Sequence, residues 1–368
     1  MGHKANKSFF DRKRPWSKRK DLILAYYLEP YLAKVRRLGR PVLLVDCFAG
    51  PGKFGDGEPG SPLIMCAKVQ AAMGRPGPEV RIWCVEPDPD LFGRLQENLT
   101  GFPFAIAKQK SFLDVIDEVG EAARTHTVFL YLDPYTPADI DYEAIDRVAQ
   151  QIQSAGASVE LLMNFNTPSF TRWGMAALVR EVPAPDPENE DTEEFDVPTT
   201  EPPGADRLTR VVGGMWWRDI LDSEQPFWKK VNSIADGVER SLRPRFNEVC
   251  WVGIRARREH PIPKYHMFFG SRHPDALELM NDAMVKARGY SDFQVDLFAD
   301  EPADRCILES ASDWIPRGEL IRQTIRRAFC RYYRKDIRGC VERLLKSGTL
   351  ESETGKLRIN DGTLVRQK

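Results

Sequence analysis

The chain has 368 residues, of which 42% are hydrophobic and 29% are charged, an ordinary composition for a soluble globular protein of about two domains. Its formal net charge is −1, so the molecule as a whole is not a polycation. No apolar run approaches the roughly eighteen residues of a membrane span, and the basic, aromatic N-terminus does not resemble a signal peptide. We therefore expect a cytoplasmic protein.

The charge is unevenly distributed along the chain. Residues 1–20 hold eight Lys or Arg against one acid, residues 181–201 hold nine acids and no base, and residues 317–346 hold ten bases against three acids. Such runs are typical of nucleic-acid contacts, and equally of a solvated surface. The seven cysteines form no Cys-x-x-Cys pair and the five histidines lack ligand spacing, so we expect no metal site, no disulfide scaffold and a reducing environment.

The first predicted element is a helix that follows a basic, aromatic arm. Leucine, tyrosine and valine recur over residues 18–38 at a spacing that gives one broad apolar face. Ser17 is its predicted N-cap, and Pro30 is expected to kink or split it. Residues 1–39 thus form the basic arm and an N-terminal helix.

Strand-like and helix-like segments then alternate. Apolar runs of strand length predict strands over residues 41–47, 80–85, 104–108, 127–132 and 159–165, the third being the weakest. The stretches between them predict helices over residues 63–73, 89–99, 112–124 and 142–155. Strands that alternate with helices indicate a parallel sheet covered by helices on both faces.

The alternation stops after residue 165. Residues 166–247 form a long excursion, and its acidic, proline-rich middle, residues 183–204, is expected to be a mobile loop. The apolar segment 213–221, which contains Met215 and two tryptophans, is expected to dock on the domain.

Two strand-like runs close this domain, over residues 249–255 and 265–269, and a helix is predicted over residues 274–288. A short connection joins the two runs, as in the terminal strand pair of a seven-stranded sheet. The predicted domain spans residues 40–290.

The last part of the chain, residues 295–368, has a different outline. Two helices are predicted over residues 317–329 and 337–347, followed by a β-hairpin over residues 349–359 that turns at Thr354-Gly355. Two helices and a two-stranded wing are the outline of a winged helix. We expect its Arg-rich helices to bind nucleic acid through phosphate contacts; docking or dimerisation is the alternative.

The first motif is a run in which an apolar strand breaks into Phe-Ala-Gly-Pro-Gly. Gly50 and Gly52 let the backbone approach a ligand without an intervening Cβ. The run lacks the Gly-Lys-Ser/Thr ending of a phosphate-binding loop and is not Gly-x-Gly-x-x-Gly. Asp46 is placed to hold the amino end of a cofactor, and the loop with Phe48 and Ala49 is placed along the cofactor's amino-acid part. A tight turn without a ligand is the alternative.

The next two predicted strands also end in polar residues. Glu86 ends the second, where a carboxylate can accept both ribose hydroxyls of S-adenosylmethionine (SAM) or of a dinucleotide. An ordinary surface acid is the alternative. Ser111 and Phe112 follow the third strand, where a hydroxyl and a ring can touch an adenine; a helix cap followed by a core phenylalanine fits equally.

The third motif, Asp133-Pro134-Tyr135, follows a buried strand. An exocyclic amino group offers two N–H donors, which the carboxylate of Asp133 and the backbone carbonyl of Pro134 can accept. Tyr135 can stack on a flipped base. Drawing both hydrogens this way leaves the nitrogen lone pair free to attack the methyl group of SAM. An Asp-Pro turn that only ends a strand is the alternative.

Taken in order, these motifs are similar to those of the bacterial three-Cys-motif partner proteins. The resemblance also rests on residues 58–63, on Lys20, and on residues 26–31 and 265–269, and it covers most of residues 16–290. It implies a class I methyltransferase-like fold, a doubly wound seven-stranded Rossmann-like α/β sheet, with SAM as cofactor. It also implies a partner that carries three clustered cysteines and resembles a radical-SAM protein.

A more distant similarity links the chain to the rRNA adenine N6-methyltransferases with an Asp-Pro-Pro-Tyr motif. Those enzymes carry a Pro-Gly-Ser-Pro run after the glycine loop, as this chain does at residues 59–62, which implies that Ser61 lies at the cofactor. The chain departs from them by one proline, so that Tyr135 takes the place of the second proline. This departure leaves the methylated atom open.

Two functions of different classes fit these observations. The first is a SAM-dependent methyltransferase that acts on RNA or DNA, in which Asp133, Pro134 and Tyr135 are catalytic. The second is a methyltransferase-like protein that binds SAM or nucleic acid and supports a partner without catalysis. Substitution of Asp133 by alanine separates them, because the scaffold role should survive it. A nicotinamide-dependent oxidoreductase would need a Gly-x-Gly-x-x-Gly turn, which the chain lacks.

Overall fold

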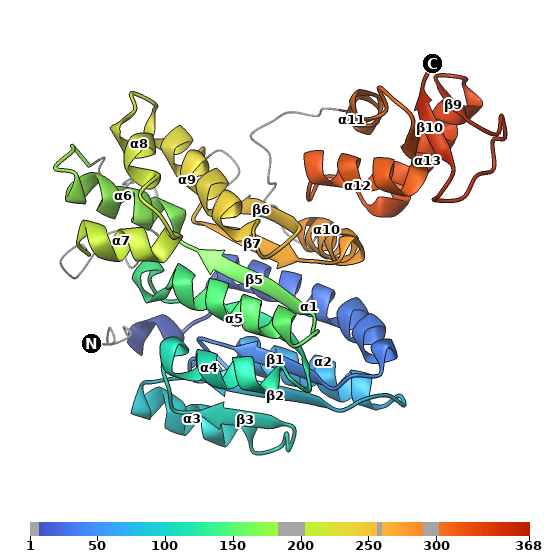
Figure 1. The fold of residues 1–368 in the computed structure, drawn as a ribbon. Coiled ribbons are helices and arrows are strands. Elements are labelled where there is room, and N and C mark those ends of the chain that lie inside the picture. Colours follow the sequence, from blue (N-terminus) through green and yellow to red (C-terminus); the bar gives the residue numbers. More distant parts are fainter. Residues whose placement is uncertain (1–6, 183–202, 256–259, 290–301) are drawn as a thin grey trace.

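The computed structural model describes residues 7–182, 203–255, 260–289 and 302–368 (Figure 1). A seven-stranded sheet with helices on both faces forms the centre, and a smaller unit follows at the C-terminus. The strands of the large sheet are β1 Val42–Asp46, β2 Val80–Val85, β3 Ala105–Lys108, β4 Thr127–Leu132, β5 Val159–Phe165, β6 Glu248–Ile254 and β7 Tyr265–Ser271.

The strand order is β3-β2-β1-β4-β5-β7-β6. Strand β7 is antiparallel to both of its neighbours and the other pairs are parallel, which confirms the predicted doubly wound sheet and its terminal pair. Strands β1 and β4 are buried at every position, as expected for central strands with continuous apolar runs. Because parallel strands end at one edge, Asp46, Glu86 and Asp133 all lie at the carboxyl edge of the sheet.

The helices around this sheet form two layers. They are α1 Pro15–Val35, α2 Ser61–Met73, α3 Pro89–Leu99, α4 Phe112–Ala122, α5 Tyr142–Ser154, α6 Thr167–Ala177, α7 Ala205–Val212, α8 Trp217–Asp222, α9 Phe227–Leu242 and α10 Pro274–Gly289. Alternate residues of β1 separate the layers, since side chains of a strand point to opposite faces. Leu43 and Val45 pack with α4 to α9, whereas Val42 and Leu44 pack with α1, α2, α3 and α10.

The start of α1 differs from the prediction. The helix begins at Pro15 with Arg14 as its N-cap, and Ser17 is buried inside the first turn. Proline suits the first helical position because its missing N–H would be unsatisfied there and its φ is already helical. Pro30 lies inside α1 and does not split it, and a short 3-10 turn over Arg36–Leu38 follows.

The excursion after β5 is helical where it is described. Trp217 is fully buried and Trp216 is partly buried against the core, whereas Met215 is 63% exposed. The docking prediction is therefore confirmed for the tryptophans and wrong for Met215. Of the predicted acidic loop, residues 183–202 lie outside the described residues.

The C-terminal unit has the element order of a winged helix. Its helices and strands are α11 Ala303–Ser310, β8 Ile315–Pro316, α12 Arg317–Arg327, α13 Arg334–Lys346, β9 Leu350–Ser352 and β10 Leu364–Gln367. The three strands form an antiparallel sheet in the order β8-β10-β9. The unit lies beside β6 and α10, at the opposite edge of the large sheet from β3 (Figure 1).

The predicted hairpin of this unit is wrong in its second strand. That strand is β10, and the connection from β9 runs over residues 353–363. The side chain of Asn360 accepts hydrogen bonds from the N–H groups of Gly362 and Thr363, at 2.9 and 3.1 Å. This side-chain turn reverses the chain after the expected strand and delays the pairing.

Membrane-spanning helices and metal-binding groups were sought in the described residues. No helix within them is long and apolar enough to cross a membrane. Their histidines, cysteines and acids form no group that could hold a metal ion.

Candidate functional site

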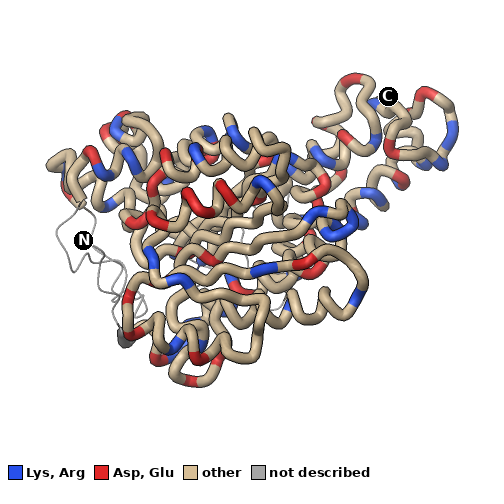
Figure 2. The backbone as a smooth tube through the Cα atoms, turned by 60° about the horizontal axis from the view of Figure 1, so that its bottom comes forward, with Lys and Arg blue, Asp and Glu red and all other residues tan. Residues whose placement is uncertain are grey.

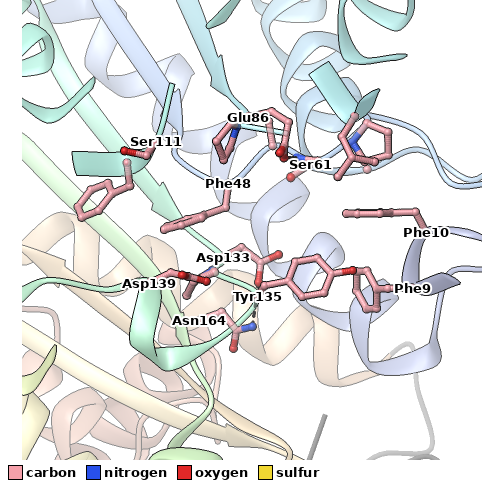
Figure 3. A pocket seen from close by; sticks show the side chains of 18 of the residues that line it. Phe9, Phe10, Phe48, Ser61, Glu86, Ser111, Asp133, Tyr135, Asp139 and Asn164 are labelled. Carbon is pink, nitrogen blue, oxygen red and sulfur yellow. Dashed lines mark hydrogen bonds between the residues drawn. The ribbon is translucent and has the colours of Figure 1, made fainter. Parts of the chain in front are cut away.

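A cavity of about 920 Å³ lies at the carboxyl edge of the large sheet, a volume within the range of small-molecule sites. Eleven of the twelve predicted site residues line it: Phe48, Ala49, Gly50, Gly52, Ser61, Glu86, Ser111, Phe112, Asp133, Pro134 and Tyr135. Figure 3 shows Asp133, Tyr135 and Asn164 on one side of Phe48, with Glu86 and Ser111 on the other. The predicted cofactor and acceptor residues therefore face one space. The twelfth residue, Asp46, lies outside it.

Glu86 ties the end of β2 to the glycine loop. Its Oε2 accepts a hydrogen bond from the Gly50 N–H at 3.0 Å, and its Oε1 accepts one from the Asp88 N–H at 2.9 Å. Burial raises the pKa of Glu86 to about 7, although both hydrogen bonds oppose this. A carboxylate has about four acceptor positions, so two remain for a pair of ribose hydroxyls.

Gly50 and Gly52 adopt left-handed backbone conformations, with φ of 58° and 77°. Only glycine takes such angles at no steric cost. A Cβ on Gly50 would also lie 2.8 Å from the ring of Phe10. The loop thus depends on glycine both for its turn and for its contact with the N-terminal arm.

Asp46 lies fully buried beneath this loop and does not line the cavity. Its Oδ1 accepts a hydrogen bond from the Phe48 N–H at 3.3 Å, and its carboxyl also interacts with the hydroxyl of Ser61. Burial raises the pKa of Asp46 to about 7, and its Oδ2 has no hydrogen-bond partner among the described residues. Asp46 reaches the cavity through Ser61, and its contact with a cofactor stays a prediction.

Ser111 and Phe112 match both sequence interpretations. Ser111 caps α4 and forms a capping box with Asp114, and Phe112 is buried in the core. Both residues also line the cavity, and the ring of Phe112 lies 5.8 Å from that of Phe48. A structural role at the start of α4 therefore coexists with a position at the cavity wall.

Asp133 is held by two side chains that the sequence analysis did not assign to the site. Its Oδ1 accepts a hydrogen bond from Asn164 Nδ2 at 2.8 Å, and its Oδ2 accepts one from the ammonium group of Lys20. Asn164 comes from β5 and Lys20 from α1, so the carboxylate is fixed from two sides. The Pro134 carbonyl oxygen accepts no hydrogen bond from the part of the chain that the structure describes.

The N-terminal arm packs over Tyr135. The Tyr135 ring lies 5.0 Å from that of Phe9 and 5.7 Å from that of Phe10, in edge-on arrangements. Phe54, from the loop after β1, joins the same group of rings. The carbonyl of Phe10 also accepts a hydrogen bond from the Gly55 N–H at 2.7 Å. The arm therefore touches the acceptor side and the cofactor side of the cavity.

Two arginines from the excursion also line the cavity. Arg207 and Arg210, on α7, share the buried carboxylate of Asp141 at 3.3 and 2.6 Å. One acid thus serves two cations, and Lys264 adds a further positive charge at the wall, over the ring of Trp16. The sequence offered no signal for Arg207 and Arg210, because the excursion has no strand pattern that would place them.

No family model matches the chain, and no curated protein matches it. Human methyltransferase-like protein 13 in complex with SAH is a similar solved structure, with 13% identity and a TM-score of 0.35, over 77% of this chain and 97% of that chain. The plantazolicin methyltransferase BamL is another similar structure, with 10% identity and a TM-score of 0.36, over 73% of this chain and 91% of that chain.

The small RNA methyltransferase HEN1 gives 12% identity and a TM-score of 0.34, over 68% of this chain and only 26% of the HEN1 chain. At these identities and TM-scores the three likenesses carry no argument about this chain. The strand order itself gives the chain a class I methyltransferase-like fold.

Proposed function

We propose that the chain is a SAM-dependent methyltransferase that acts on an amino group of a base in RNA or DNA, most simply the N6 group of adenine. The observation that carries the proposal is a shared cavity. It brings the carboxylate of Glu86 and the glycine loop together with Asp133 and the carbonyl of Pro134. A nucleoside cofactor and a base amino group thus have suitable partners within one space.

The residues of the cofactor side fit SAM by their chemistry. Glu86 would accept the ribose hydroxyls, and the backbone of the loop from Phe48 to Gly52 would follow the amino-acid part. Ser61 would contact the amino-acid part with Asp46 behind it, and Ser111 and Phe112 would border the adenine. SAM, when bound, supplies an electrophilic methyl group.

On the acceptor side, the chain's own residues orient an amino group. Asp133 keeps acceptor positions free beside its bonds to Lys20 and Asn164, since each carboxylate oxygen can accept twice. It would take one N–H of the amino group, and the Pro134 carbonyl would take the other. The nitrogen lone pair is then directed away from both acceptors. Lys20 and Asn164 hold the carboxylate in that orientation.

The family resemblance adds a partner to the proposal. A protein with three clustered cysteines, similar to a radical-SAM protein, would act together with this chain. We include it in the assay below, because methyl transfer by this chain alone and transfer that needs the partner are both consistent with the proposal.

One observation favours a second function, a SAM- or nucleic-acid-binding scaffold without catalysis. The ring of Tyr135 already packs against Phe9 and Phe10, so it is less accessible to a base than a free stacking ring. A scaffold would still bind SAM through Glu86 and the glycine loop.

The test separates binding from transfer. Calorimetry measures the affinity for SAM and for its demethylated product, and labelled SAM reports transfer to cellular RNA and DNA, with and without the partner. Asp133→Asn keeps the shape but replaces an acceptor by a possible donor, so transfer should fall about a hundredfold while SAM affinity stays within twofold. Asp117→Asn, an exposed residue of α4, is the control. SAM binding without any transfer in the wild type would leave the scaffold as the function.

A further inference from the structure

Helix α13 occupies the place of the recognition helix in the winged-helix unit, and its N-terminal end is covered. In helix-turn-helix proteins this end contacts the base edges. Here the Arg334 N–H donates to Asp282 Oδ1 at 2.8 Å, and the Arg334 guanidinium pairs with Glu278. Both acids belong to α10. Helix α10 of the large domain thus covers the end of α13 that would otherwise enter a groove of the nucleic acid.

The turn that precedes α13 is fixed to α10 as well. Asn281 Nδ2 donates to the Tyr332 carbonyl at 2.8 Å, and Asn281 Oδ1 accepts from the Cys330 N–H at 2.9 Å. Asn281 is fully buried, so both bonds are shielded from water. Separating α13 from α10 would leave these groups without partners, which opposes release of the helix end for another ligand.

Most bases of the Arg-rich segment are also neutralised within the molecule. Seven of its ten bases form ion pairs with acids: Arg317 and Arg338 with Asp361, Arg322 and Arg326 with Glu319, Arg327 with Glu309, Arg334 with Glu278, and Arg343 with Asp304. Figure 2 shows Asp and Glu interspersed with Lys and Arg over this unit. Counterion release needs cations that are free to meet phosphates, so the paired arginines of α12 and α13 are poor candidates.

The wing, residues 353–363, differs from the helices. Lys356 and Arg358 are exposed and form no ion pair with any described residue, and Leu357 between them is 54% exposed. The wing tip is nevertheless fixed, since Ser352 Oγ donates to the Lys356 carbonyl at 2.8 Å and the Gly355 N–H donates to the Ser352 carbonyl at 2.9 Å. Two cations beside an apolar side chain on a fixed turn suit a phosphate backbone and a groove edge.

Two further cations lie at the other end of the β9–β10 hairpin. Lys346 ends α13, and the Lys368 N–H donates to the Thr349 carbonyl at 3.1 Å, which places the two lysines at the same end of the unit. Neither has an ion-pair partner in the described ranges. Since β9 is three residues long, the two ends of the hairpin lie roughly 10 Å apart.

We propose that the wing surface, formed by Lys346, Lys356, Leu357, Arg358 and Lys368, binds the phosphate backbone of a nucleic acid, and that the N-terminal end of α13 instead fastens the unit to α10. The expectation that the Arg-rich helices carry the phosphate contacts is thereby replaced. The proposal rests on the proposed function in one respect only, that the substrate is a nucleic acid.

The experiment measures binding of the full-length protein to a fluorescent RNA hairpin and to a fluorescent DNA duplex, without SAM, between 50 and 200 mM salt. Lys356→Gln/Arg358→Gln removes two wing cations. Lys335→Gln/Arg343→Gln removes two from α13 and is the matched control. The logarithm of affinity falls with the logarithm of salt by about 0.9 for each contacted phosphate of a duplex. The wing variant should therefore lower affinity at least tenfold and make the DNA slope shallower by about 1.8, and the control should change neither.

Equal losses in both variants would overturn the proposal, because net charge rather than the wing would then decide binding. Loss in the α13 variant alone would return the contact to the helix, and absence of binding to both probes at 50 mM salt would also overturn the proposal. Wing-dependent binding to RNA only, or to DNA only, supports the proposal and shows which of the two nucleic acids the wing surface binds. Because SAM is absent, the result is independent of methyl transfer.

Discussion

Two regions of the molecule are rich in charged side chains, the carboxyl edge of the large sheet and the C-terminal unit, and they differ in what those charges face. At the sheet edge, burial raises the pKa of Asp21 to about 6 and that of Glu86 to about 7. In the C-terminal unit, a hydrogen bond from Arg305 lowers the pKa of Glu309. Asp21, on α1, and Glu86 both line the cavity. Glu309 instead lies between two arginines, Arg305 and Arg327.

This difference between the two regions shows that the number of charged residues in a stretch of sequence does not by itself indicate a functional site. The acids whose pKa values rise here are buried, and their loss of hydration outweighs their hydrogen bonds and ion pairs. Such acids tend to mark functional sites. Acids that already pair with arginines satisfy the structure instead. Residues 317–346 are the most basic stretch of the chain's second half, and the structure uses most of their charge internally.

The largest effect is expected when Glu86, the acid that we assign to the cofactor, is removed. Glu86→Ala should weaken SAM binding ten- to a hundredfold, because a charged acceptor of two hydroxyl hydrogen bonds contributes about 1.5–3 kcal/mol. Calorimetry measures this change. The matched change in the other region is Glu309→Ala, which should leave SAM affinity within twofold. Equal SAM affinity of Glu86→Ala and the wild type would show that the carboxylate does not hold the ribose.

A smaller effect is expected at the residue that holds Asp133. Lys20→Met removes one of the two donors to that carboxylate, so the rate of methyl transfer should fall about tenfold while SAM affinity is unchanged. Lys20→Arg keeps a donor and should recover part of the rate, which a purely packing role would not explain. The matched control is Lys34→Met, whose pair with Asp275 is exposed. Loss of SAM binding in Lys20→Met would contradict a positioning role.

Sequence reasoning predicted the sheet well because each strand is an apolar run that ends at a turn. It also placed Glu86 and Asp133 at one edge, since the carboxyl ends of parallel strands meet there. It did not find Lys20 at the site, because the contact with Asp133 joins residues 113 positions apart through helix packing. Asn164 did carry a signal, as a polar residue near the carboxyl end of a mainly apolar strand.

In the C-terminal unit, the contacts that matter most were not predictable from the sequence. Its helices α12 and α13 and its strand β9 were predicted, whereas α11, β8 and the position of β10 were not. Its ion pairs were not predicted either, because Arg334 and Glu278 lie in different domains and Arg317 and Asp361 lie 44 positions apart. Charge runs in a sequence report the number of cations and not their partners. The role of the unit therefore depends on tertiary contacts that local patterns do not contain.

The smallest expected effect is a pH dependence of stability, which should come from the buried acids of the large domain and not from the paired acids of the C-terminal unit. An acid with a raised pKa binds its proton more tightly in the folded state. Its stabilising contribution is complete below the pKa of the unfolded chain, about 4, and is lost as pH rises to the folded pKa. With Asp21 near 6, and Asp46, Glu86 and Glu160 near 7, the melting temperature should fall between about pH 5 and pH 7.5.

Glu86→Gln removes one such group and should flatten that fall, by at most about 1.4 kcal/mol per pH unit in the free energy of unfolding. Glu309→Gln should leave the profile in this window unchanged, because a carboxyl with a lowered pKa is ionised throughout it. Thermal unfolding followed by circular dichroism at closely spaced pH values measures all three proteins. A melting temperature that rises from pH 5 to pH 7.5 would show that the buried acids of the large domain are not proton-stabilised, and the contrast between the two regions would then not hold.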